Sequence, residues 1–151
     1  MIKREIGILI FGLFLIGCVS TNAKYFSNIK PTDDKTYGYS AENPITIKNG
    51  DLQNSINSSY YYLSQLATEK LNKLRIIQRY SIPNPNYKKP VLPLANRYTG
   101  QPMNYGNGPI LDKYILIPEN EKDTIVLYIN PYIKGNGVKI PAGLIFSRLS
   151  D

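Results

Sequence analysis

The sequence predicts a small α+β domain, in which one amphipathic helix packs on an antiparallel sheet of about four to five strands. Apolar residues recur three and four positions apart between residues 52 and 73, which is the spacing of one helix face. Two later stretches, 110–117 and 124–130, alternate between apolar and polar residues as half-buried strands do. A chain of 151 residues holds one modest domain.

The chain begins with the pattern of a signal peptide. Residues 1–17 have a charged start and then an apolar run from Ile6 to Ile16, which is shorter than the roughly 20 residues of a membrane-spanning helix. The run ends in Leu15-Ile16-Gly17-Cys18, and these residues resemble the lipobox of bacterial lipoproteins. The resemblance implies that Cys18 receives a diacylglyceryl group and, after cleavage before it, becomes the acylated first residue. The alternative is an ordinary secretory signal with an incidental Cys.

A flexible tether is predicted between the leader and the domain. Residues 19–36 are polar, include Pro31 and show no periodicity, so we interpret 18–36 as the acylated Cys with its tether. Residues 37–151 then form the single α+β domain. Because Cys18 is the only Cys, the acylated chain has no thiol left for a disulfide, and its stability must come from packing.

The first half of the domain contains two predicted strands. Ile45 and Ile47 alternate ahead of Asn49-Gly50, a turn signal, which indicates a short edge strand. Residues 74–82 also alternate well enough for a strand, and Pro83 ends it.

The predicted helix lies within residues 52–73. Weak helix formers between 54 and 59 leave open whether it begins at Leu52 or near Ser58. Residues 60–62 are three successive tyrosines, and successive helical residues point about 100 degrees apart. These tyrosines therefore cannot all face the core, and at least one is expected to be exposed.

The second half combines a long loop with strands. Residues 83–109 contain six prolines among Asn, Gly and Tyr, which is typical of an irregular loop, and long ordered loops tend to carry function. Strands 110–117 and 124–130 follow, joined by a charged turn. A third strand is expected over 138–146, where a Pro and a Gly indicate an edge or a bulge.

Composition excludes several kinds of site. The chain has no His and one Cys, which excludes imidazole bases, Ser-His-Asp triads and Cys/His zinc sites. The net charge of the chain is +7, but the basic residues are scattered, so the charge is interpreted as serving solubility. The alternative is that the basic residues bind lipid phosphates. Nucleic acid is not expected as a partner. Glu119, Glu121 and Asp123 share one turn without the spacing of an EF-hand, so a solvated turn is favoured and neither a metal nor a cofactor is expected.

Three motifs of the domain carry a resemblance. Residues 37–45 read Tyr-Gly-Tyr-Ser-Ala-Glu-Asn-Pro-Ile, 122–130 read Lys-Asp-Thr-Ile-Val-Leu-Tyr-Ile-Asn, and 141–146 run from Pro to Phe. Together they are similar to a group of small bacterial lipoproteins, some of which bear the name of a 2-dehydro-3-deoxyphosphooctonate aldolase. Such an aldolase is a TIM barrel of about 250 residues, and a domain of about 110 residues cannot close eight βα units. The resemblance therefore implies a lipoprotein without that activity.

Tyrosine is the unusual residue, with 13 Tyr and no Trp. A Tyr ring pairs a flat apolar face with a hydroxyl, so exposed tyrosines suit a sugar ring or a partner protein. The alternative is that Tyr replaces Phe at the edge of a small core. The candidate binding residues, on the helix and in or beside the Pro-rich loop, are Tyr61, Tyr87, Arg97, Tyr98, Asn104 and Tyr105.

These observations predict a lipid-anchored cell-envelope protein that is not an enzyme. We expect an accessory or structural subunit of an envelope protein assembly, held by its lipids in the outer membrane. The lipoprotein sorting rule favours the periplasmic face over the cell surface, because no Asp follows Cys18 and no early acidic run is present. The alternative is a glycan- or peptide-binding module that uses the Tyr-rich loop. A hydrolase using Glu119 or Asp112 is a third alternative, without a matched nucleophile and base.

Overall fold

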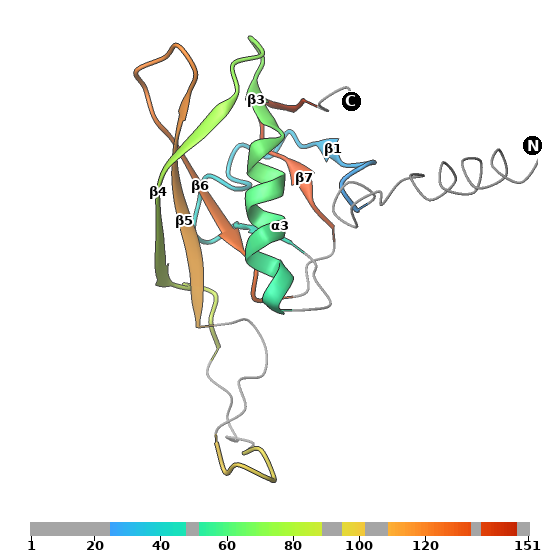
Figure 1. Cartoon of the computed structure of the whole chain (residues 1–151), viewed down its shortest axis with the longest axis vertical. Coiled ribbons are helices and arrows are strands. Elements are labelled where there is room, and N and C mark those ends of the chain that lie inside the picture. Colours follow the sequence, from blue (N-terminus) through green and yellow to red (C-terminus); the bar gives the residue numbers. More distant parts are fainter. Residues whose placement is uncertain (1–24, 48–51, 89–94, 102–108, 134–136, 148–151) are drawn as a thin grey trace, which may run out of the picture.

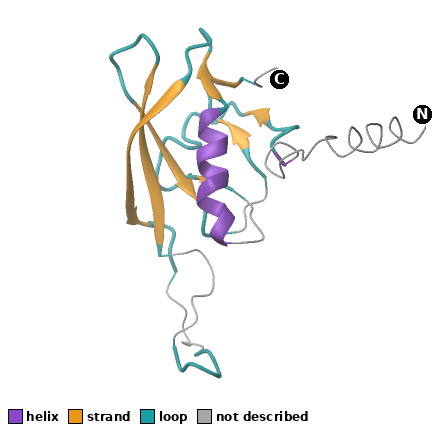
Figure 2. Ribbon diagram, viewed as in Figure 1, coloured by secondary structure: helices purple, strands orange, loops and turns teal. Residues whose placement is uncertain are grey.

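The computed structural model describes residues 25–47, 52–88, 95–101, 109–133 and 137–147, and it confirms the small α+β class. Figures 1 and 2 show one helix against a twisted sheet, with shorter strands beside it. In chain order the elements are β1 (Lys30–Pro31), β2 (Ile45–Thr46), α3 (Leu52–Ser64), β3 (Leu66–Thr68), β4 (Leu74–Pro83), β5 (Ile110–Pro118), β6 (Ile125–Asn130), β7 (Lys139–Ile140) and β8 (Leu144–Phe146).

The central sheet has the strand order β2-β6-β5-β4. Strands β4, β5 and β6 are antiparallel neighbours, as their alternating sequences predict. Strand β2 instead pairs in parallel with β6, so the sheet is mixed and the prediction of a purely antiparallel sheet is wrong at this edge. Parallel neighbours need a crossover connection, and here the chain passes through α3, β4 and β5 before β6 returns beside β2.

The two remaining sheets have two strands each. β1 pairs with β7 in parallel, and β3 pairs with β8 antiparallel. The single strand predicted over 138–146 is therefore two short strands, separated at Pro141 to Gly143. Gly143 has a φ of 78°, a left-handed conformation that glycine adopts without strain, and the turn it makes sends β8 to a different partner.

Helix α3 covers one face of the central sheet. Its first residue is Leu52, so the weak helix formers do not delay the start. Of the three tyrosines, Tyr62 is fully buried, Tyr61 is half-buried and Tyr60 is 41% exposed, which confirms that they cannot share one environment. The buried core also contains Ile45, Ile47, Leu63, Leu66, Tyr114, Leu116, Leu127 and Ile129.

The folded domain begins earlier than the sequence predicts. Phe26 is 1% exposed, and its ring lies 5.7 Å from Tyr61 in a stacked arrangement and 5.5 Å from Tyr62. Residues 25–36 are thus part of the fold, and their assignment to a flexible tether is wrong. A single aromatic anchor with one short strand gives no periodic pattern to detect.

Candidate functional site

An ion pair joins β4, an edge strand of the central sheet, to its neighbour β5. The Arg79 guanidinium on β4 donates to the Asp112 carboxylate on β5 at 2.9 Å, and the Asp112 side chain is fully buried. The Ser81 and Tyr132 hydroxyls donate to the other carboxylate oxygen at 3.2 and 3.3 Å. Asp112 thus accepts three hydrogen bonds, which is how a protein interior holds a carboxylate.

This cluster changes the acidity of its members. Burial disfavours the Arg79 cation, but the hydrogen bond and charge of Asp112 outweigh burial, so the pKa of Arg79 is raised. Burial, together with the charge of Asp112, raises the pKa of Tyr114. The same two causes raise the pKa of Tyr132. At neutral pH the cluster therefore holds a stable cation and protonated tyrosines.

The geometry gives this cluster a structural role. Asp112 is engaged by three donors, whereas Glu119 lies exposed in the turn after β5. The two lie seven positions apart in the chain, a span of about 23 Å at about 3.3 Å per residue. The structure therefore does not bring these two carboxylates together. Among the described residues, no group of three His, Cys, Asp or Glu side chains is placed to hold a metal ion.

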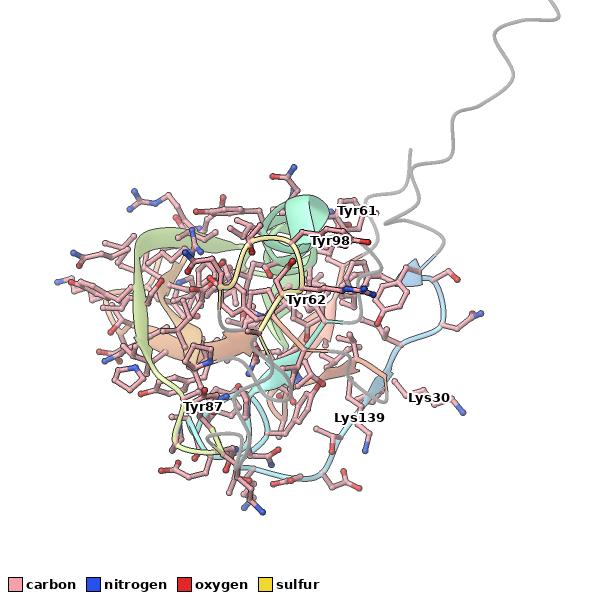
Figure 3. The ribbon with its side chains drawn as sticks, turned by 90° about the horizontal axis from the view of Figure 1, so that it is seen from below. Lys30, Tyr61, Tyr62, Tyr87, Tyr98 and Lys139 are labelled. Carbon is pink, nitrogen blue, oxygen red and sulfur yellow. The ribbon has the colours of Figure 1, made fainter. Side chains whose placement is uncertain are left out.

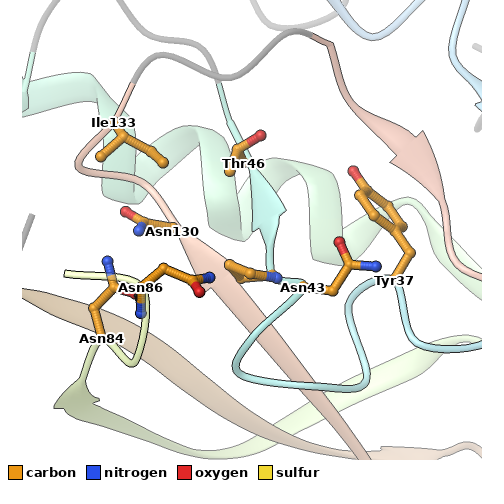
Figure 4. Close-up of a pocket in the computed structure, with 8 residues that line it drawn as sticks. Tyr37, Asn43, Thr46, Asn84, Asn86, Asn130 and Ile133 are labelled. Carbon is orange, nitrogen blue, oxygen red and sulfur yellow. Dashed lines mark hydrogen bonds between the residues drawn. The ribbon is translucent and has the colours of Figure 1, made fainter. Parts of the chain in front are cut away.

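A polar pocket lies where three strands end. Strands β2, β4 and β6 run in the same direction, because β2 is parallel to β6 and both β4 and β6 are antiparallel to β5. Their carboxyl ends therefore meet at one edge, where a pocket of about 200 Å³ is found. Its polar lining comes mainly from four asparagines, Asn43, Asn84, Asn86 and Asn130, with Tyr37, Pro44, Thr46 and Ile133 completing it (Figure 4).

Hydrogen bonds to the backbone hold the pocket wall together. The Asn84 side chain accepts the Asn86 N–H at 3.0 Å, and the Asn86 amide donates to the Glu42 carbonyl at 2.7 Å. The loop after β4 is thereby fixed to the segment before β2. Asn130 is 1% exposed, and its Oδ1 accepts the Tyr132 N–H at 3.1 Å.

Gly38 allows the segment before β2 to turn into this wall. Its φ is 80°, its N–H donates to the Asn43 carbonyl at 2.8 Å, and its carbonyl accepts the Tyr128 N–H at 2.7 Å. A Cβ at this position would lie 2.9 Å from the Ile45 side chain, so both the backbone and the packing require glycine.

The predicted tyrosine surface is dispersed in the structure. Tyr61 packs on Phe26 near the core, whereas Tyr87 is half-buried in the loop after β4. Arg97 and Tyr98 are exposed, and Tyr98 is 92% exposed. Figure 1 shows the turn 95–101 at the lower end of the molecule, far from α3, and Figure 3 labels Tyr61, Tyr87 and Tyr98. The structure therefore does not bring Tyr61 into one surface with Tyr98.

Three predicted residues lie outside the described part of the chain: Cys18, Asn104 and Tyr105. The described part contains no helix long and apolar enough to cross a membrane. The pocket asparagines were not among the predicted site residues. A signal for two of them does exist in the sequence, since Asn84 directly follows one predicted strand and Asn130 ends another.

Comparisons with protein-family models, with curated proteins and with solved structures each gave no match to this chain.

Proposed function

We propose that this chain is a lipid-anchored envelope protein that acts by binding, as an accessory or structural subunit of an assembly at the outer membrane. The observation that carries the proposal is the sequence Leu15-Ile16-Gly17-Cys18, which places the only Cys of the chain at the position that lipoprotein acylation uses. Several acyl chains give stable anchoring, whereas a single chain gives only marginal binding. On this proposal the protein acts at the membrane and not as a diffusing catalyst.

The position of the first folded residues supports a short anchor. The fold includes Tyr25 and Phe26, so only residues 19–24 separate Cys18 from it. Six residues span at most about 20 Å when fully extended. The domain would therefore stay close to the lipid surface, and a partner would have to reach it there.

The surface near this start is also suited to anionic lipid. Lys30 and Lys139 are register partners on β1 and β7, and both side chains are exposed (Figure 3). Like charges on neighbouring strands repel, and the phosphates of a membrane surface would offset that repulsion. Lys30 lies five residues along the chain from Tyr25, and the strand register brings Lys139 beside it.

Acylation is tested by metabolic labelling with an alkyne fatty acid. We expect label and a cleaved leader in the wild type and in Ser20→Ala, the matched neighbouring substitution. Cys18→Ser should carry no label and keep its leader, because the thiol that accepts the diacylglyceryl group is gone. Normal processing of Cys18→Ser would contradict the lipid anchor.

The assembly is tested by cross-linking intact cells, then purifying the lipidated protein and identifying partners by mass spectrometry. We expect a stoichiometric membrane partner with the wild type and its loss with Cys18→Ser. Recovery of the monomer alone, at native abundance, would overturn the role as a subunit.

A glycan- or peptide-binding module is the second candidate function, favoured by the 92% exposure of Tyr98. An aromatic ring held in water on a loop is available to stack on a sugar or to enter a partner's surface. Calorimetry against envelope glycans and peptides should then give heat that Tyr98→Ala removes. Flat titrations, or heat unchanged by Tyr98→Ala, would exclude this surface.

A further inference from the structure

We propose that the pocket at the ends of β2, β4 and β6 binds an uncharged sugar ring. The inference concerns the folded domain and does not depend on the lipid anchor or on the Tyr98 loop. It is carried by three properties of the pocket: the charge of its lining, the hydrogen-bonding groups that the lining presents, and its size.

The lining selects an uncharged ligand. None of the eight lining side chains is an acid or a base: four are amides, two bear hydroxyls and two are apolar. A charged group that gives up part of its hydration in this open pocket finds no counter-charge to compensate. A sugar phosphate, a sugar acid or the terminus of a peptide would therefore be disfavoured, whereas neutral hydroxyl groups would not.

The amides offer both donors and acceptors, as a sugar hydroxyl requires. The Asn43 amide group donates to Asp34 at 2.8 Å and to Thr36 at 2.9 Å, which leaves its Oδ1 as an acceptor. Asn130 has the opposite arrangement, because its Oδ1 accepts the Tyr132 N–H and its NH₂ group is the donor. The two orientations are fixed before a ligand arrives, so little ordering is needed on binding.

The apolar members complete the match. Pro44 and Ile133 line the pocket with the ring of Tyr37, and such surfaces suit the C–H faces of a pyranose. The Tyr37 hydroxyl itself accepts the Lys139 N–H at 3.1 Å, which fixes the ring. Figure 4 shows Tyr37 and Asn43 on one side of the pocket and Asn84 and Asn86 on the other.

The size favours one sugar ring over a peptide. A volume of about 200 Å³ lies below the roughly 300–1,000 Å³ of pockets that bind drug-sized molecules, so a single small ring is the size that it suits. An extended peptide binds by adding its backbone along an open strand edge. This pocket instead lies beyond the ends of the strands, so it suits a compact ligand with hydrogen-bonding groups on its rim.

Saturation-transfer NMR on the full-length protein tests the proposal, in a detergent whose headgroup is not a sugar. The neutral probes are glucose, galactose, mannose and N-acetylglucosamine, each titrated alone. Glucose 6-phosphate and triglycine are the charged and the peptide probes. We expect at least one neutral sugar to bind in the millimolar range, and both other probes to bind at least about tenfold more weakly.

Four variants locate the binding site. Ile133→Trp fills the pocket and should abolish sugar binding. Ile77→Trp is the matched control, because Ile77 is a half-exposed residue of β4 about 20 Å from the end of the strand. It should leave sugar binding unchanged. Thr46→Val removes a lining hydroxyl with little change in shape and should weaken binding by about three- to tenfold. Tyr98→Ala distinguishes this pocket from the exposed loop, which is the alternative surface for a sugar. Thermal unfolding of each variant verifies the fold.

Four results would overturn the proposal. The first is that no neutral sugar binds. The second and third are that glucose 6-phosphate or triglycine binds as tightly as the neutral sugars. The fourth is that Tyr98→Ala abolishes sugar binding while Ile133→Trp and Thr46→Val retain it. The last result would assign sugar binding to the exposed loop. None of them bears on acylation of Cys18, which the labelling experiment tests separately.

Discussion

At the scale of single residues, the Arg79–Asp112 pair is expected to contribute to stability. The Arg79 side chain is 25% exposed, so Asp112→Asn leaves a partly hydrated cation and should cost about 1–3 kcal/mol, less than the loss of a partner from a fully buried pair. Urea unfolding at neutral pH measures the change in the free energy of unfolding. Glu119→Gln neutralises an exposed carboxylate and should change the free energy of unfolding by less than about 0.5 kcal/mol.

The double variant Arg79→Leu/Asp112→Leu completes this test. Replacing both members of a buried pair with apolar residues is often close to neutral, because no charge is left unpaired. We expect the double variant to recover most of the stability that Asp112→Asn loses. A loss of stability for Asp112→Asn no larger than that for Glu119→Gln would show that the pair does not contribute to the fold.

Asp34 links the pocket to pH, because its carboxylate accepts a hydrogen bond from the pocket residue Asn43. The side-chain hydrogen bond from Thr36, at 2.7 Å, is the largest cause that lowers the pKa of Asp34 below its ordinary value of 3.8. A carboxyl whose pKa is lowered by folding stabilises the fold above pH 3.8, and that contribution is lost as the pH falls through the lower folded value. Protonation weakens one of the two acceptors of the Asn43 amide group, so the pocket wall should loosen in the same range.

An NMR titration of the Asp34 carboxyl carbon measures this pKa directly. We expect a midpoint below 3.8 in the wild type, a rise toward 3.8 in Thr36→Val, and a low midpoint in Thr36→Ser, which keeps the hydroxyl. A midpoint that Thr36→Val leaves unchanged would mean that the hydroxyl does not hold the carboxylate.

Residues also explain which parts of the site the sequence could predict. The separation of Tyr60, Tyr61 and Tyr62 followed from helical geometry alone, and the structure bears it out. The pocket was not predicted, because its asparagines come from separate turns and share no spacing. Asn43 and Asn130 lie 87 residues apart in the chain, and only the strand register brings them to one edge. Non-local placement of this kind leaves no pattern in a sequence window.

At the scale of elements, the accuracy of prediction followed the length of each strand. The longer strands β4, β5 and β6 were predicted within one or two residues, because several alternating positions report on one buried face. The two-residue strands β1 and β7 were missed or merged, since two residues show no period. The parallel edge at β2 was also missed, because alternation shows that a strand forms but not which direction its neighbour runs.

The segment before β2 is the element whose role changed most, and truncation tests it. A chain that starts at Tyr25 should be about as stable as one that starts at Cys18, whereas a chain that starts at Tyr37 lacks Phe26 and β1 and should unfold at lower denaturant. In the full chain, Phe26→Ala should cost about 3–5 kcal/mol in the free energy of unfolding. Phe146→Ala, a half-buried aromatic beside the same cluster, should cost less. Full stability of the chain that starts at Tyr37 would restore the tether assignment.

At the scale of the whole molecule, the proposed lipid anchor would determine which end of the domain faces the membrane, because few residues separate Cys18 from the fold. β1 lies near the start of the fold, whereas the turn 95–101 lies at the far lower end (Figure 1). With at most about 25 Å of chain between Cys18 and Tyr25, an anchored domain can tumble but cannot exchange these two ends freely. On the proposed anchor, β1 therefore lies nearer to the membrane on average than Tyr98 does.

Fluorescence quenching by a lipid with a nitroxide headgroup measures this difference in vesicles. On the proposed acylation of Cys18, the only Cys of the chain, Lys30→Cys or Tyr98→Cys supplies a single free thiol for the fluorophore. We expect stronger quenching of the label at position 30 than at position 98. A spacer of about 20 Gly and Ser residues between Lys24 and Tyr25 adds a mean reach of about 25 Å and should reduce the difference. Equal quenching at the two positions with the native connection would contradict the expectation that β1 lies nearer to the membrane than Tyr98. It would indicate that the tethered domain has no preferred orientation.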